Sequence, residues 1–163
     1  MKLMQGKTNV TNMIDPATLP PNIQAILRKP SPASQYLGLE FLECDPQKGH
    51  VKVAYQASDQ LCNLWGGIHG GMVAAIMDDV LALTFGLTIA WGQITPTLEL
   101  KTTFLQAARP GRLLAEGVIL RRGKSISFAE AELRSADGEL LAKASATASI
   151  VTLKPKDGSK AKD

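Results

Sequence analysis

One apolar segment interrupts a sequence that otherwise reads as strands. Residues 71–85 run Gly-Met-Val-Ala-Ala-Ile-Met-Asp-Asp-Val-Leu-Ala-Leu-Thr-Phe, rich in good helix formers and apolar on nearly every side. This pattern predicts a buried helix, roughly 22 Å long at a rise of about 1.5 Å per residue. A single buried helix needs other elements to cover it, so we expect the rest of the chain to supply a sheet.

Most of the remaining chain alternates apolar and polar residues with the period of two that is typical of half-buried strands. The alternating runs lie near residues 37–41, 51–55, 98–104, 112–120, 125–134 and 140–150. Asp137-Gly138 gives a strong hairpin turn signal between the last two runs. The pattern predicts an α+β fold class, with about six antiparallel strands curved around one long helix.

The length of 163 residues fits one domain better than two. We expect an N-terminal arm at residues 1–34, a main domain at residues 35–153 and a tail at residues 154–163. The arm is rich in proline, and residues 21–28 predict a short helix within it. The tail has no large apolar anchor, which predicts disorder.

The composition leaves few groups for elaborate chemistry. The chain has two histidines and two cysteines and lacks C-x-x-C and H-E-x-x-H motifs, so we predict no structural zinc. A net charge of +3 without a basic, aromatic-rich stripe argues against nucleic-acid binding. The longest apolar run, from Met72 to Ile89, contains two aspartates, which argues against a membrane span. With two cysteines and no export signal, we expect a cytoplasmic protein.

Two consecutive aspartates, Asp78 and Asp79, lie within the predicted helix. Desolvation disfavours a charged carboxylate, so a buried one needs partners or water. Consecutive helix residues point about 100° apart, so the two side chains are not expected to face one site together. We expect one to be functional and the other to be structural or at an interface. The alternative is that both reach solvent or an interface and only anchor the helix.

A glycine-rich cluster, Asn63-Leu-Trp-Gly-Gly-Ile-His-Gly-Gly71, comes directly before the helix. Free N–H groups at a helix start lie at the positive end of the helix dipole, where they can stabilise a developing oxyanion. The cluster therefore predicts an oxyanion hole. A flexible loop with a capping role is the alternative, and His69 alone is also compatible with a structural histidine.

His69 and Asp78 are nine positions apart. Along a continuous helix this spacing is roughly 13 Å, too far for both side chains to act on one carbonyl group. If both serve one reaction, we expect them to come from different chains. A two-fold dimer with antiparallel helices would then form two equivalent sites.

The spacing of these residues resembles that of the hot-dog fold acyl-CoA thioesterases of the phenylacetate-degradation type. The resemblance rests on Asn63, on His69-Gly70-Gly71 and on Asp78, and it covers about residues 35–152. It implies a hot-dog fold, in which an antiparallel sheet of about six strands wraps around one long central helix. It also implies a homodimer or a dimer-of-dimers tetramer. The arm at residues 1–34 departs from a minimal hot-dog domain.

The resemblance further implies roles for individual residues. Asp78 is similar to the catalytic carboxylate, which acts as a general base on water or as a nucleophile at the thioester carbonyl. The Gly70 N–H resembles the oxyanion donor, and His69 and Asn63 would help to orient the carbonyl and the water. Thr97 resembles a position where the family often has a hydroxyl that orients water.

The implied substrate-binding set adds Gly71 and the basic turn of Arg121, Arg122, Lys124 and Ser125. This turn resembles one that contacts the phosphates or the pantetheine of CoA. From the residues alone, a solvated hairpin is an equal alternative.

The resulting hypothesis is hydrolysis of an acyl-CoA thioester to a carboxylic acid and free CoA. No metal or redox cofactor is expected, because the CoA moiety is part of the substrate. A hot-dog enoyl-CoA hydratase or dehydratase and a non-catalytic acyl-CoA binding protein are the alternatives. Five large side chains fit either an acyl pocket or an ordinary core, and they leave the acyl group unidentified: Met72, Met77, Trp65, Phe85 and Trp91.

Overall fold

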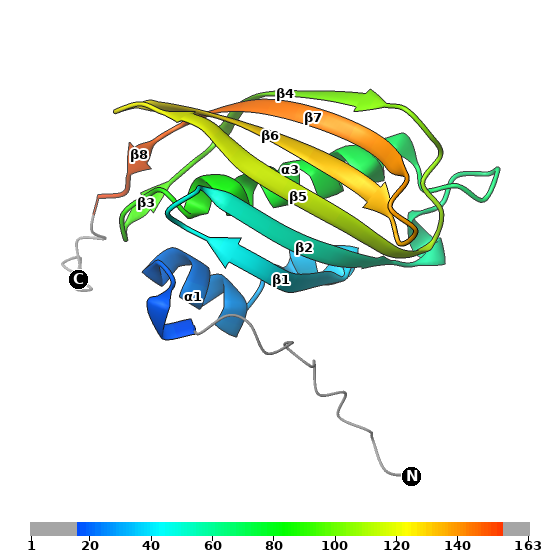
Figure 1. The fold of residues 1–163 in the computed structure, drawn as a ribbon, viewed down its shortest axis with the longest axis horizontal. Coiled ribbons are helices and arrows are strands. Elements are labelled where there is room, and N and C mark those ends of the chain that lie inside the picture. Colours follow the sequence, from blue (N-terminus) through cyan, green and yellow to red (C-terminus); the bar gives the residue numbers. More distant parts are fainter. Residues whose placement is uncertain (1–15, 155–163) are drawn as a thin grey trace, which may run out of the picture.

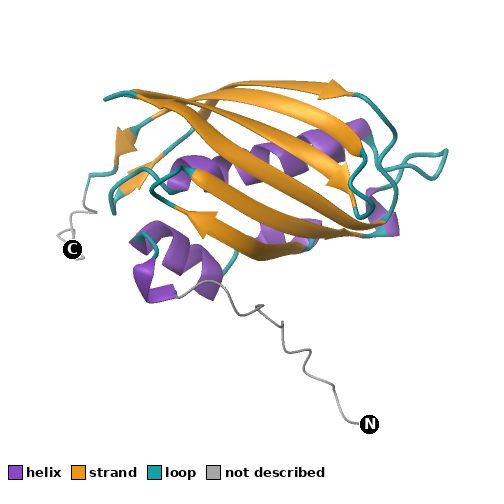
Figure 2. Ribbon diagram, viewed as in Figure 1, coloured by secondary structure: helices purple, strands orange, loops and turns teal. Residues whose placement is uncertain are grey.

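A six-stranded antiparallel sheet wraps around one long helix, α3 (Gly70–Gly86), in the computed structural model, which describes residues 16–154 (Figure 1). The strand order is β1-β2-β5-β6-β7-β4. The strands are β1 (Leu39–Asp45), β2 (His50–Ala57), β4 (Thr97–Phe104), β5 (Gly111–Arg122), β6 (Ile126–Ser135) and β7 (Leu140–Ser149). This arrangement confirms the predicted α+β class, and strands dominate the secondary structure throughout (Figure 2).

The alternation in the strands has the expected structural cause, because one face of the sheet packs on the helix. In β7 every second residue from Ala142 to Ala148 is buried, and the residues between them are exposed or half-buried. The helix supplies the other half of the core through residues such as Ile76, Met77 and Val80, none of which is exposed. Apolar burial of this kind contributes about 25 cal/mol per Å² of area removed from water.

Gly117 in β5 allows the helix to approach the sheet closely. A Cβ at this position would lie 2.0 Å from Thr84 Oγ1, so no larger side chain fits without a shift of the helix. The Thr84 hydroxyl is buried and donates to the carbonyl of Val80, one turn earlier in α3.

In the described part of the arm, from residue 16 onward, one α-helix lies within it and a second begins at its end, and only the first was predicted. α1 (Pro21–Arg28) has the predicted boundaries, and Ile23 packs its Cδ1 atom against Gly86 at the end of α3. α2 (Pro32–Leu37) was not predicted, and it displaces the expected start of the first strand from residue 37 to Leu39. The strand-like alternation of apolar residues at Leu37, Leu39 and Phe41 continues across the end of α2. It therefore concealed the boundary between this helix and the first strand.

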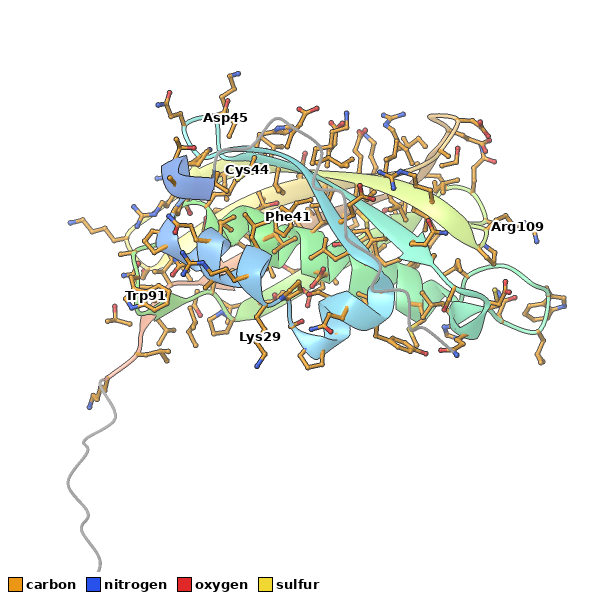
Figure 3. All side chains as sticks on the ribbon, turned by 90° about the horizontal axis from the view of Figure 1, so that it is seen from below. Lys29, Phe41, Cys44, Asp45, Trp91 and Arg109 are labelled. Carbon is orange, nitrogen blue, oxygen red and sulfur yellow. The ribbon has the colours of Figure 1, made fainter. Side chains whose placement is uncertain are left out.

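Short elements complete the fold. A two-residue pair, β3 (Gln93–Ile94) with β8 (Val151–Thr152), and two 3-10 turns at Pro16–Thr18 and Asp59–Leu61 had no signal in the periodicity. Trp91 beside β3 and Arg109 before β5 mark opposite ends of the molecule (Figure 3). The tail predicted at residues 154–163 lies, apart from residue 154, outside the described residues. No helix within residues 16–154 is long and apolar enough to cross a membrane.

Candidate active site

One stripe of α3 is left uncovered by the sheet. Gly71, Ala75 and Ala82 are exposed and Asp78 is half-buried, whereas the other faces of the helix are largely buried. The prediction of a buried helix is therefore right for the sheet-facing sides and incomplete for this one. The stripe borders a groove of about 450 Å³ between α3 and β4, lined by Gly71, Ala74, Ala75, Asp78, Thr97, Leu98, Glu99 and Leu100.

Asp78 and Thr97 meet in this groove. The Thr97 hydroxyl, at the first residue of β4, donates to Asp78 Oδ1 at 2.9 Å. Asp78 Oδ2 accepts no hydrogen bond from residues 16–154, so this oxygen is available to a water molecule or a substrate. The carboxylate is thus held at one oxygen and free at the other, as a general base or a nucleophile requires.

His69 is the N-cap of α3. Its Nδ1 accepts from the Gly71 N–H at 3.0 Å, so in the neutral imidazole the proton is on Nε2. The exposed His69 ring can therefore donate from Nε2. The Gly71 N–H is occupied by this cap, whereas the Gly70 N–H makes no hydrogen bond within the described part of the chain and can donate to an oxyanion.

Asn63 belongs to the loop between the 3-10 turn Asp59–Leu61 and α3, and this loop projects beside the start of α3 (Figure 1). Its Oδ1 accepts from the Trp65 N–H at 2.9 Å, and its own N–H donates to the Gly67 carbonyl at 2.8 Å. Asn63 and Gly70 share a second groove of about 310 Å³, otherwise lined by Ile68, Val73, Phe104, Leu105, Gln106, Ala107 and Ala108. This groove contains no charged side chain.

A single protomer does not bring all of these groups together. Because α3 is continuous from Gly70 to Gly86, the His69 cap and Asp78 lie about 13 Å apart along its axis. Asn63 and Gly70 line one groove, and Asp78 and Thr97 line the other.

The basic turn between β5 and β6 lies at the other end of the sheet from the start of α3 (Figure 1). Arg121, Arg122, Lys124 and Ser125 are all exposed there. Arg122 pairs with Ser127, Ser127 with Ala148, and Ala148 with Thr97. With strands about 4.8 Å apart, this row places the Arg122 backbone about 14 Å from that of Thr97.

Sequence reasoning missed the environment of Asp79. This carboxylate accepts hydrogen bonds from Ser34 Oγ at 2.7 Å and from Tyr55 Oη at 2.9 Å. Burial raises the pKa of Asp79, the two hydroxyl donors oppose that rise, and the neighbouring Asp78 adds to it. Asp78 is therefore the aspartate of the pair that faces the open groove. Since Ser34 and Tyr55 are distant in sequence, only the tertiary fold reveals this contact.

The five large side chains considered for an acyl pocket divide into two groups. Met77 and Phe85 are fully buried in the core, and Met72 packs against it. Trp65 and Trp91 are 86% and 69% exposed, on a loop tip and beside β3. Of these five, only Trp65 is on the loop that borders the second groove.

Comparison with known proteins agrees with this fold. The chain matches the thioesterase superfamily over residues 66–142. It is 34% identical to a phenylacetic acid degradation-related protein of Ralstonia eutropha JMP134 that bears the name of a thioesterase, with 78% of this chain and 98% of that chain covered and a TM-score of 0.74. It is 29% identical to a protein of Saccharolobus solfataricus that bears the name of an esterase, over 75% of this chain and 85% of the relative.

A more distant likeness concerns the fold alone. The protein smu.793 of Streptococcus mutans UA159, solved with acetyl-CoA bound, is 22% identical, with a TM-score of 0.63 and coverage of 72% of this chain and 91% of that chain. The sheet of six antiparallel strands around one long helix is the arrangement expected of a hot-dog fold. The chain therefore belongs to the thioesterase superfamily, with the hot-dog fold of the phenylacetate-degradation type.

Proposed function

We propose that the protein hydrolyses acyl-CoA thioesters to a carboxylic acid and free CoA. The observation that carries the proposal is Asp78, held by the Thr97 hydroxyl at one oxygen and free at the other, in an open groove. The acetyl-CoA bound to the Streptococcus mutans protein supports a CoA thioester as the substrate. Enoyl-CoA hydration and ligand binding without turnover have no observation that favours them here.

In the proposed reaction, Asp78 takes a proton from water as the water oxygen attacks the thioester carbonyl carbon. The carbonyl oxygen becomes an oxyanion that accepts hydrogen bonds from the Gly70 N–H and from His69 Nε2. Collapse of this intermediate breaks the C–S bond, and the CoA thiolate leaves and takes up the proton. Direct attack by Asp78 would instead form an anhydride that water then hydrolyses. Both routes use the free Asp78 oxygen.

The separation of these groups supports a site shared between the two chains of a homodimer. Asp78 and the His69 cap are about 13 Å apart in one chain, too far for a single carbonyl. Two features support a second copy as the missing half: the small side chains of the exposed α3 stripe, and the free edge of β4, where Leu98 and Phe104 are more than half exposed. A two-fold dimer, alone or paired as a tetramer, supplies the His69 cap of one chain to Asp78 of the other.

The basic turn is proposed to bind the CoA phosphates. Arg121, Arg122 and Lys124 are exposed and unpaired with any carboxylate in the described residues, so their charges are available to an anion. The separation of about 14 Å between Arg122 and Thr97 along this row of paired strands is the span that the pantetheine arm would bridge between the phosphates and the thioester.

Release of thiol from a panel of acyl-CoA substrates tests the function. We expect turnover by the wild type and a loss of at least about a hundredfold in kcat for Asp78→Asn. Asp137→Asn, in the exposed turn between β6 and β7, is the matched control and should retain activity. Release that survives Asp78→Asn would overturn the assignment of the base. If the wild type releases no thiol from any acyl-CoA, the function itself is wrong, and an enoyl-CoA hydration assay then separates the two alternatives.

A further inference from the structure

A chain of buried hydroxyl groups ends on the carboxylate next to Asp78. Asp79 Oδ1 accepts from Ser34 Oγ of α2 at 2.7 Å, and Asp79 Oδ2 accepts from Tyr55 Oη of β2 at 2.9 Å. Ser34 and Tyr55 are 3% and 0% exposed. Ser34 Oγ also lies 2.8 Å from the hydroxyl of Ser31, the N-cap of α2. Two elements, α2 and β2, therefore converge on one carboxylate of α3.

If these hydrogen bonds served only the stability of the fold, they would be an unfavourable choice in free energy. Asp79 forms no ion pair within residues 16–154, so its charge is balanced only by neutral donors. Taking a carboxylate out of water carries a penalty that well-packed apolar residues at the same position would avoid. A buried polar group of this kind fixes geometry more effectively than it adds stability.

The geometry that it fixes is the rotation of α3 about its own axis. The two hydrogen bonds to Asp79 come from α2 and β2, and so they tether the middle of the helix at two points. Asp78 is the preceding residue, and its side chain points about 100° away. On the open side, Gly71, Ala75 and Ala82 offer little bulk to hold the helix in register against β4. Packing of the buried α3 residues on the sheet places the helix, and the hydrogen bonds to Asp79 add a polar constraint on the residue next to Asp78.

We propose that Asp79 is a positioning residue, and that the Ser34–Asp79–Tyr55 chain holds Asp78 in its productive orientation toward Thr97. The inference rests on the proposed function, because it assigns Asp79 a task in the same hydrolysis. Small displacements of a catalytic group are costly: a shift of about 1 Å can reduce a rate by about a hundredfold.

Steady-state kinetics on Asp79→Asn and Tyr55→Phe test this role. We expect kcat to fall about tenfold in each variant while KM stays within twofold, at a temperature well below each Tm. In the double variant, kcat should fall no further than in Asp79→Asn, since both changes cut the same chain. Thr84→Ala is the matched control: it removes another buried hydroxyl of α3 that does not touch Asp79, so it should lower Tm without lowering kcat.

A kcat within twofold of the wild type in both variants, with only Tm reduced, would overturn the inference. If Asp79→Asn does not fold, Tyr55→Phe decides alone, because it leaves both carboxylates in place.

A second measurement does not depend on turnover. In protein labelled with ¹³C at the aspartate carboxyl carbons, the Asp78 resonance is assigned by its loss in Asp78→Asn. Tyr55→Phe should move this resonance and Thr84→Ala should not. If the Asp78 resonance does not move in Tyr55→Phe, the positioning role of Asp79 is wrong, whether or not the wild type releases thiol. If the wild type releases no thiol but the resonance does move, the proposed function is wrong and the positioning of Asp78 by Asp79 stands.

Discussion

Asp78 and Asp79 are neighbours in the chain, and the fold gives them opposite environments. Asp78 lies in an open groove and accepts one hydrogen bond, whereas Asp79 lies against α2 and β2 and accepts two. In the proposed reaction, Asp78 carries the reacting oxygen and Asp79 is its anchored neighbour. Sequence spacing predicted that only one of the pair would face the site, and it singled out Asp78 by resemblance. It did not reveal the partners of Asp79, which lie 24 and 45 residues away.

The buried carboxyl of Asp79 makes a prediction about stability and pH. Burial raises its pKa above the value of about 3.9 in the unfolded chain, so the folded protein binds this proton more tightly. Its contribution to stability is therefore fully present below the unfolded pKa and is lost as the pH rises through the raised folded pKa. As the pH rises from the unfolded pKa of Asp79 through its raised folded pKa, the unfolding free energy of the wild type should fall relative to that of Asp79→Asn.

Urea unfolding of the wild type and Asp79→Asn across this pH range measures the effect. Comparing the two proteins cancels the acid sensitivity of other carboxylates, such as Glu132, whose pKa is lowered by Lys143 and Arg134. A difference in unfolding free energy that is constant with pH would contradict the prediction.

At the scale of elements, Gly117 of β5 allows α3 to approach the sheet closely at Thr84. Gly117→Ala would place a methyl group 2.0 Å from Thr84 Oγ1, so we expect a loss of about 1–3 kcal/mol in the free energy of unfolding, measured by urea denaturation. The helix tether near Asp78 would also be strained. Adding Thr84→Ala should restore part of the loss because it removes the clashing hydroxyl. If the double variant is less stable than Gly117→Ala alone, the clash is not the cause.

The six main strands, α3 and the short helix α1 were predictable, whereas α2, the β3–β8 pair and the 3-10 turns were not. Alternation identified the six main strands, and the apolar run at residues 71–85 identified α3 to within one residue at each end. α2 begins at Pro32 and has only six residues, so its apolar pattern was too short to be recognised as helical. Yet α2 carries Ser34, so the missed helix is also the source of the missed contact to Asp79.

At the scale of the whole molecule, the separation of the His69 cap from Asp78 predicts complementation between chains. Asp78→Asn and His69→Ala should each be inactive alone, and mixing them under conditions that exchange subunits should restore activity. A random mixture forms mixed dimers in about half of the cases, each with one intact site and one doubly defective site, so we expect about a quarter of wild-type activity.

Thiol release by the mixture, compared with each parent at the same total concentration, is the measurement. Activity no higher than that of the parents would show that each chain holds its own complete site.

The uncovered stripe of α3 has a consequence for how such a protein behaves in a cell or a test tube. A chain with its catalytic groups divided along one helix can be fully folded and still idle when it is alone. The rate of turnover per chain then rises with protein concentration until every chain is in a dimer. Synthesis and dilution therefore set the specific activity as well as the amount of the protein. Gly71, Ala75 and Ala82, small and chemically inert, would in this way link catalysis to concentration.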